Sequence, residues 1–141
     1  MNAVATVENY LARMKEWESK HRARTRSEQY KSDDCYRESQ KVESKKELLD
    51  IFQEFVEDGA KNRLSESRLS ILAVSSPSEF NQVIINGEET SNQAIIYTKQ
   101  LDGFEEHFRF TLKSASSQGE WRISKLAVSL DGVQWEARRS L

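Results

Sequence analysis

The stretch AIIYTKQLDGFEEHFRFTLK, residues 94–113, decides the fold of this chain. It contains two runs rich in β-branched and aromatic residues, joined by Asp102-Gly103, a pair that accepts the positive φ of a tight turn. The stretch WRISKLAVSLDGVQWEA, residues 121–137, repeats this pattern around Asp131-Gly132. Neighbouring strands with such short connections predict an antiparallel meander.

The predicted sheet begins before these two stretches and includes a further turn between them. Its strands are placed at 82–85, 94–101, 104–113, 121–130 and 133–137, with Asn86-Gly87 as the first tight turn and a looser turn at 116–119. Along 104–113, one face is expected to carry Phe104, Phe108, Phe110 and Leu112.

The predicted strand at 121–130 contains an irregularity. Its apolar residues change parity, from Trp121 and Ile123 to Leu126, Val128 and Leu130. Since side chains alternate between the two faces, all of them reach one face only if the strand has a bulge or kink near Ser124-Lys125. We therefore expect a strongly bent sheet, which forms a cone with a pocket when helices pack in its concavity.

The first half of the chain is helical in character, with no glycine before Gly59. Steps of three and four residues place one stripe on a first helix, formed by Val7, Tyr10, Leu11, Met14, Trp17 and His21. A second helix is expected from Ser44, where Ser44-Lys45-Lys46-Glu47 has the spacing of a capping box, and a start near Cys35 stays open. Gly59 is expected to close this helix in a left-handed conformation. Helices followed by strands predict an α+β fold.

Composition limits the classes of protein to consider. The 141 residues predict a single domain over 1–141, and 37% hydrophobic and 31% charged residues fit a core with a well-solvated surface. A net charge of −2 and a pI near 5.8 argue against a nucleic-acid binder. The sequence shows no signal peptide and no membrane span, and its single cysteine excludes an internal disulfide, so we expect a cytoplasmic protein without membrane contact.

No motif in the sequence supplies a reaction. A phosphate-binding glycine loop, HExxH, CxxC and a nucleophile elbow are missing, and neither His21 nor His107 has a second histidine or a cysteine nearby. Cys35 stands among acidic residues that disfavour a reactive thiolate. The basic run 20–26 fits a solvated helix end better than a phosphate-binding patch, because no aromatic residue interleaves it. We therefore expect no enzyme activity, no metal site and no cofactor.

Five local patterns resemble a family of bacterial immunity proteins with the nuclear transport factor 2-like fold. Two lie in the helical half, at Met14-Lys15-Glu16-Trp17-Glu18 and at Ile51-Phe52 with Phe55. A third combines Arg68-Leu69-Ser70 with Ser76-Pro77-Ser78-Glu79-Phe80-Asn81, where serine and asparagine replace a common proline and aspartate. The last two are Gly119-Glu120-Trp121-Arg122-Ile123-Ser124, where Ser124 replaces the family's aspartate, and Asp131-Gly132-Val133-Gln134-Trp135-Glu136.

The resemblance implies a cone-shaped fold, with N-terminal helices packed in the concave face of a bent antiparallel sheet. It also implies a protein that binds and neutralises a cognate toxin, often a nuclease, encoded beside it in a bacterial polymorphic toxin system. The family defines no catalytic residues, so none are assigned to this chain. A small-molecule-binding or lyase/isomerase-like protein that uses the central pocket is the alternative, and a homodimer stays open.

The predicted partner-binding residues are Glu88, Glu89, Glu105 and Glu106, since each pair stands beside a predicted tight turn. Exposed turns carry binding residues more often than the scaffold does. The negative charge of these residues suits a basic toxin, because complementary charges speed the encounter of two proteins.

Overall fold

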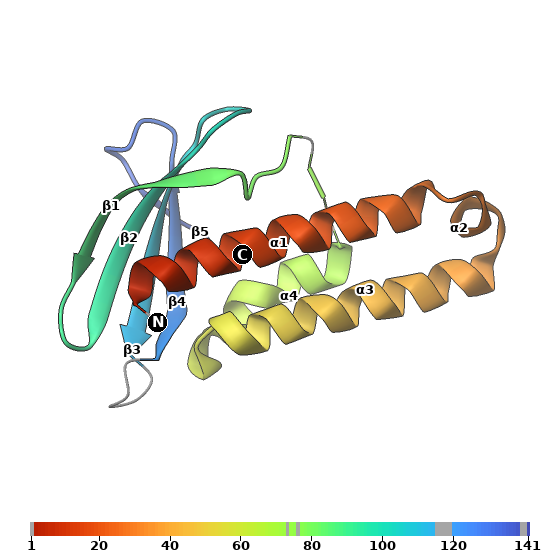
Figure 1. The fold of residues 1–141 in the computed structure, drawn as a ribbon, viewed down its shortest axis with the longest axis horizontal. Coiled ribbons are helices and arrows are strands. Elements are labelled where there is room, and N and C mark those ends of the chain that lie inside the picture. Colours follow the sequence, from red (N-terminus) through yellow and green to blue (C-terminus); the bar gives the residue numbers. More distant parts are fainter. Residues whose placement is uncertain (1, 73, 76, 115–119, 139–140) are drawn as a thin grey trace.

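Figure 1 shows a computed structural model of the chain, which describes residues 2–72, 74–75, 77–114, 120–138 and 141. Its elements, in chain order, are α1 (Ala3–Arg26), α2 (Glu28–Ser32), α3 (Asp34–Phe55), a 3₁₀ turn η1 (Asp58–Ala60), α4 (Lys61–Ile71), β1 (Gln82–Glu89), β2 (Gln93–Gln100), β3 (His107–Ser114), β4 (Trp121–Ser129) and β5 (Glu136–Arg138). The strands form one antiparallel sheet in the order β1-β2-β3-β4-β5, which confirms the α+β fold and the meander. The predicted turn at 116–119 lies outside the described residues.

Helix α1 covers the sheet with its first half and extends past the sheet with its second half, where α3 runs beside it (Figure 1). Its 24 residues span roughly 36 Å, whereas a sheet of five strands is roughly 19 Å across. The helix begins after Asn2, whose side chain accepts a hydrogen bond from the Ala5 amide at 2.7 Å. The predicted stripe is confirmed, since all of its residues are buried, from Val7 to His21.

Helix α3 is one continuous helix that begins at Asp34, close to the earlier of the two predicted starts. Asp33 caps it by accepting a hydrogen bond from the Tyr36 amide at 3.1 Å. The predicted capping box at Ser44 is wrong, because Ser44 lies in the middle of α3 and is fully buried. Its hydroxyl is 2.7 Å from His21 Nδ1 and accepts a hydrogen bond from Arg24 at 2.9 Å. These contacts with α1 satisfy a polar side chain that local sequence assigns to a helix end.

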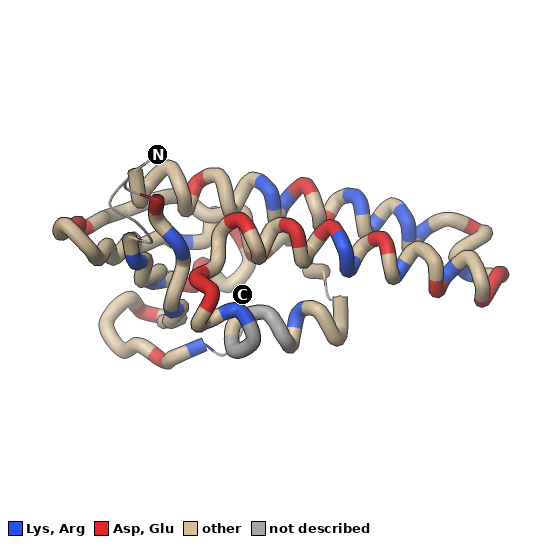
Figure 2. The backbone as a smooth tube through the Cα atoms, turned by 90° about the horizontal axis from the view of Figure 1, so that it is seen from below, with Lys and Arg blue, Asp and Glu red and all other residues tan. Residues whose placement is uncertain are grey.

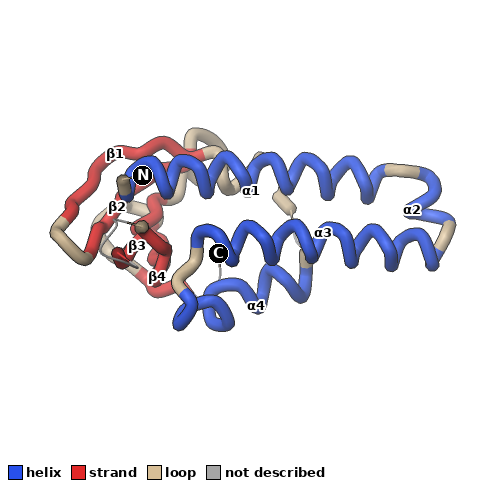
Figure 3. Tube along the Cα trace, turned by 60° about the horizontal axis from the view of Figure 1, so that its bottom comes forward, coloured by secondary structure: helices blue, strands red, loops and turns tan. Residues whose placement is uncertain are grey.

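The prediction that Gly59 closes this helix is also wrong, because α3 ends at Phe55. Val56 leaves the helix in an extended conformation and pairs with Ile123 of β4. The amide of Glu57 then donates to the Ile123 carbonyl at 2.9 Å. Pairing with the sheet therefore ends the helix before Gly59, which lies in η1. Helix α4, which the sequence pattern did not predict, follows directly (Figure 3).

Strand β1 continues through Asn86-Gly87, so the predicted hairpin turn at this pair is wrong. The register of β1 on β2 shifts after Ile84, and this irregularity accommodates the pair inside the strand. The hairpin closes instead at 90–92, where the Thr90 amide donates to the Gln93 carbonyl at 2.8 Å.

Gly87 lies opposite Ile96 of β2 in the register and beside the first turn of α1. A Cβ atom at this position would lie 3.1 Å from Ile96 Cδ1 and 3.8 Å from Val4 Cγ2 of α1. The missing side chain thus leaves room for the Ile96 side chain at a position where the sequence pattern indicated a turn.

The other two glycine turns are confirmed, with positive φ at Gly103 (71°) and Gly132 (78°). Phe104, predicted to lie on the core face of the following strand, is 87% exposed. The physical reason is that β3 begins only at His107, so Phe104 belongs to the turn.

The predicted bulge in β4 is confirmed. Thr111 pairs with Lys125 and Leu112 pairs with Ile123, so the register skips Ser124. The Ser124 hydroxyl donates to the Thr111 carbonyl at 3.1 Å and fixes the irregular step. Ile123 before the bulge and Leu126 after it therefore both face the core. Leu130, predicted on the same face, is 75% exposed because β4 ends at Ser129.

Trp17 is the largest buried side chain of α1, at 2% exposure, and its indole Nε1 donates to the Ser44 carbonyl of α3 at 2.8 Å. Replacement of Trp17 by alanine should lower the free energy of unfolding by about 3–5 kcal/mol. Trp121, expected to be a second core residue, is half-buried at the start of β4, so Trp121→Ala should cost less. Urea denaturation measures both changes, and equal losses would contradict this ranking.

Candidate partner-binding surface

The motifs that carry the family resemblance meet inside the fold. Glu18 of α1 is 1% exposed and accepts hydrogen bonds from the Ser78 hydroxyl and, at 3.2 Å, from the Ser75 amide. The tryptophan-glutamate pair of the first helix thus holds the segment that leads into β1. Ser76, which belongs to the same motif, lies outside the described residues.

Glu79, in the same segment, forms a largely buried ion-pair network. Its carboxylate contacts Arg68 of α4 and, at 2.9 Å, Arg138 of β5. Arg68 also donates through Nε to the Leu141 carbonyl at 2.9 Å and lies over the Phe80 ring at 5.1 Å. Burial acts to raise the pKa of Glu79, but the two guanidinium groups outweigh it and hold this pKa below its ordinary value.

Where the sequence predicted a pocket, the described residues of the interior leave only a small cavity. A cavity of about 10 Å³ lies beside Tyr10, Phe110 and Arg138, and this volume corresponds to about one water molecule. The Tyr10 hydroxyl is buried without a hydrogen-bond partner among the described residues, and burial raises the pKa of this phenol above its ordinary value. The described interior therefore gives no support to the alternative of a small-molecule-binding or lyase/isomerase-like protein.

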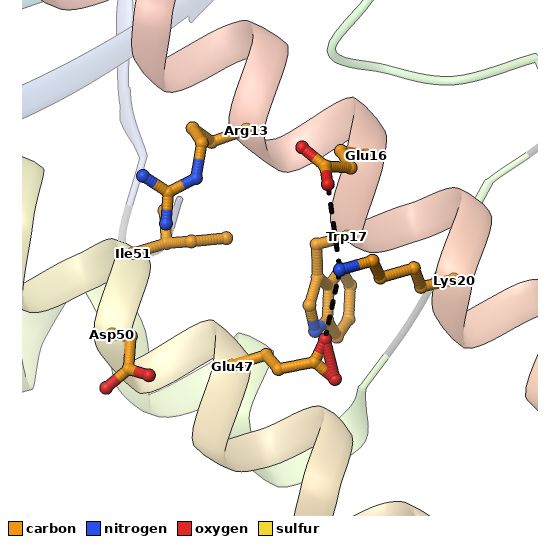
Figure 4. Close-up of a pocket in the computed structure, with 7 residues that line it drawn as sticks. All are labelled: Arg13, Glu16, Trp17, Lys20, Glu47, Asp50 and Ile51. Atoms are coloured by element: carbon orange, nitrogen blue, oxygen red, sulfur yellow. Dashed lines mark ion pairs between the residues drawn. The ribbon is translucent and has the colours of Figure 1, made fainter.

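A groove of about 160 Å³ lies between α1 and α3, and ion pairs span it (Figure 4). Lys20 stands between Glu16, at 3.6 Å, and Glu47, at 3.9 Å. Arg24 contacts Glu47 at 2.5 Å. Figure 2 shows acidic and basic residues interspersed along both helices in the same way. Of the basic run 20–26, Lys20 and Arg24 thus contact α3, whereas Arg22 donates to the Ser75 carbonyl at 2.6 Å. Exposed pairs of this kind contribute about 0–1 kcal/mol each.

The structure separates the four predicted partner-binding glutamates into two pairs. Glu88 and Glu89 are exposed at the end of β1, whereas Glu105 and Glu106 lie in the turn between β2 and β3, where Glu106 is half-buried. Glu88 pairs with Ile95 of β2, and the Glu106 carbonyl accepts from the Gln100 amide five residues farther along, so the two pairs are roughly 17 Å apart along the strand. They do not form one patch, and their role in binding stays a prediction.

The outer face of the sheet carries an aromatic cluster that the sequence analysis did not single out. The ring centres of Tyr97 and Trp135 lie 5.8 Å apart, and the Arg109 guanidinium is 5.0 Å from the Trp135 ring centre. A depression of about 360 Å³ adjoins this cluster, beside Glu88 and His107. The available signal was the alternation of β2 and β3, which pairs Tyr97 with Arg109 on the face opposite the core.

A second depression, of about 370 Å³, lies at the turn between β4 and β5, where Glu106 approaches from the neighbouring turn. Asp131 fixes this turn, because its carboxylate accepts hydrogen bonds from the amides of Gln134, at 3.0 Å, and Val133, at 2.8 Å, and from the Ser129 hydroxyl at 2.9 Å. These bonds lower the pKa of Asp131 to about 2. The carboxylate therefore carries its negative charge at neutral pH.

Two other kinds of site are missing from the described residues. Nowhere among them do three or more His, Cys, Asp or Glu side chains gather as they would to hold a metal ion. In the same part of the chain, no helix has the length and apolar character needed to cross a lipid bilayer.

A helical layer laid in a bent antiparallel meander, with a bulge that turns β4, defines an α+β protein of the nuclear transport factor 2 fold. The family described as NTF2 fold immunity protein matches residues 2–136, so the chain belongs to this family. No curated protein and no solved structure matches the chain.

The network around Glu79 predicts a dependence of stability on pH. Because the folded pKa of Glu79 is depressed, its stabilisation is fully present above the unfolded pKa, about 4.5, and is lost as the pH falls through the folded pKa. Glu79→Gln should lower the free energy of unfolding by on the order of 3 kcal/mol at pH 7, since it leaves two guanidinium groups without their carboxylate. Urea denaturation at pH 7 and at pH 3 measures this difference.

The matched control is Glu54→Gln, which removes an exposed ion pair with Arg13. We expect it to change stability by less than about 1 kcal/mol at either pH. A Glu79→Gln deficit of the same size at pH 7 and pH 3 would contradict a role for the Glu79 charge.

Proposed function

We propose that this protein is a cytoplasmic immunity protein whose single domain, residues 1–141, binds a cognate bacterial toxin domain and blocks its activity without a cofactor. The observation that carries the proposal is the family match over residues 2–136. The filled interior supports it further, because it leaves the outer surface as the part of the molecule that meets other molecules.

We propose further that the toxin is a nuclease. Proteins that handle nucleic acids use lysine and arginine to contact phosphates, so their binding surfaces are basic. Exposed acidic residues lie at the end of β1, at Glu88 and Glu89, and in the turn before β3, at Glu105. Complementary charge of this kind speeds association and covers the surface that the nucleic acid would use.

The direct test is rescue of cells from the toxin. The gene immediately upstream is expected to encode a large secreted protein, and its C-terminal domain is expressed in a bacterial host with or without this chain. We expect growth arrest and degradation of nucleic acid without the chain, and normal growth with it. Failure of the chain to rescue growth or to co-purify with that domain would contradict the proposed function, and arrest without loss of DNA or RNA would contradict only the nuclease.

A charge-reversal variant tests the predicted partner-binding residues. Lysine at positions 88, 89, 105 and 106 in place of the four glutamates should slow association with that toxin domain at low salt, and the difference should shrink at high salt. Stopped-flow or surface-plasmon measurements of the association rate at two salt concentrations check this. If both proteins associate equally fast at low salt, the four glutamates are only solvated surface.

A further inference from the structure

We infer that one end of the sheet docks on the toxin, through the turn residues 101–106 and 129–136, which we call the turn end. This inference rests on the proposed function and deepens it, because it selects one of the two glutamate pairs and adds apolar residues that the sequence analysis did not assign. Three observations carry it: the two turns adjoin, they expose apolar side chains, and they carry charge of one sign.

The two turns lie side by side at the same end of the sheet (Figure 1). His107, the first residue of β3, pairs with Lys99 near the end of β2 and with Ser129 at the end of β4. A Cβ atom on Gly132 would lie 3.4 Å from the His107 ring, so the second turn rests against the base of the first. Glu106 of the first turn lines the same depression as residues of the second turn.

The turn end exposes large apolar side chains that a folded protein usually covers. Their exposed fractions are 57% for Leu101, 87% for Phe104, 75% for Leu130 and 77% for Val133. Single exposed apolar residues need no explanation, but several on adjoining turns, rimmed by polar residues, mark an interaction surface. An aromatic side chain such as Phe104 serves in such a surface as the anchor that fills a pocket of the partner.

The same turns carry acidic residues and no lysine or arginine of their own. Their acidic residues are Asp102, Glu105, Glu106, Asp131 and Glu136, and the stretches 101–106 and 129–136 contain no lysine or arginine. Of the two arginines that follow the turns, Arg138 pairs with Glu79 inside the fold. Arg109 lies over Trp135, at the outer-face margin of the turn end. Lys99 precedes the first turn, on the outer face of β2.

This charge decides the occupant. Contact between two copies of the turn end would bring carboxylates against carboxylates, so a symmetric dimer through this surface is disfavoured. An anionic lipid surface is repelled for the same reason. A basic protein surface with an apolar recess would complement both properties of the turn end. The nucleic-acid-binding face of a nuclease supplies the basic charge, and the inference assigns the recess to that face.

The apolar part is tested with the paired substitution Phe104→Ser and Leu130→Ser. Both side chains are exposed, so their loss should leave the thermal unfolding temperature within a few degrees of the unchanged chain. The matched control is Val42→Ser with Ile71→Ser, which removes apolar side chains of similar exposure, 66% and 69%, from α3 and α4. Titration calorimetry against the upstream toxin domain should show at least about a tenfold weaker complex for the first variant, and less than about a twofold change for the control.

The charged part is tested with the two glutamate pairs separately. Glu105→Lys with Glu106→Lys should slow association at about 0.15 M salt, where charges are screened beyond about 8 Å, whereas Glu88→Lys with Glu89→Lys should leave it nearly unchanged. Sedimentation of the free chain accompanies both tests. A dimer that dissociates in the Phe104→Ser, Leu130→Ser variant would assign the surface to a second copy and overturn the inference.

The outcomes separate the inference from the proposed function. If the unchanged chain binds and neutralises the toxin and the turn-end variants do so equally well, the docking surface is elsewhere and the function stands. If the unchanged chain does not bind the toxin, both are overturned. Loss of binding in the turn-end variants alone, with the controls intact, supports the inference.

Discussion

The arrangement of helices and sheet depends on the two ion pairs that the Glu79 carboxylate forms. It holds Arg68 of α4 and Arg138 of β5, and Arg68 in turn holds the carbonyl of Leu141. A buried charge is tolerated only where it is paired, so these groups must stay together. This ion pair also affects the surface. Strand β5 has only 3 residues, and Arg138 is one of them, so the pair holds the whole strand. Its anchoring inside the fold fixes where the turn between β4 and β5 emerges.

The sequence predicted those parts of the fold that periodicity alone determines. The stripe of α1, the meander and the bulge at Ser124 follow from which side chains must face the core, and the structure has all three. Three local signals failed because tertiary contacts override them. The hydroxyl of Ser44 bonds to α1, the chain before Gly59 pairs with β4, and Asn86-Gly87 lies inside β1 and pairs with β2.

The candidate site was predictable only in part, for a related reason. Acidic residues beside glycine turns can be read from the sequence, and Glu105 and Glu106 do lie in such a turn. Their distance from Glu88 and Glu89 depends on which end of β2 each turn occupies. The sequence could not predict this distance, because it placed the first turn wrongly at Asn86-Gly87. The exposure of Phe104 was hidden as well, because alternation assigns an aromatic residue to the core until the start of the strand is known.

The residues that carry the family resemblance therefore explain the fold more than the target. Glu18 and Glu79 hold internal segments together, and Trp17 joins α1 to α3. The side chains available to a partner lie in the turns, outside most of these motifs. A scaffold of this kind separates the stability of the fold from the recognition of a partner. Turn residues can change to suit another partner while the buried contacts stay the same.

The overhang of the two long helices has a consequence for motion. The far ends of α1 and α3 contact each other and α2, and no residue of α2 is buried. Opening of this end would break only contacts that are close along the chain and would leave the sheet intact. In native-state hydrogen exchange, the amides of 27–40 should therefore exchange through local opening, well before those of β3 and β4. We therefore expect the helical end to open locally while the sheet that presents the turns stays folded.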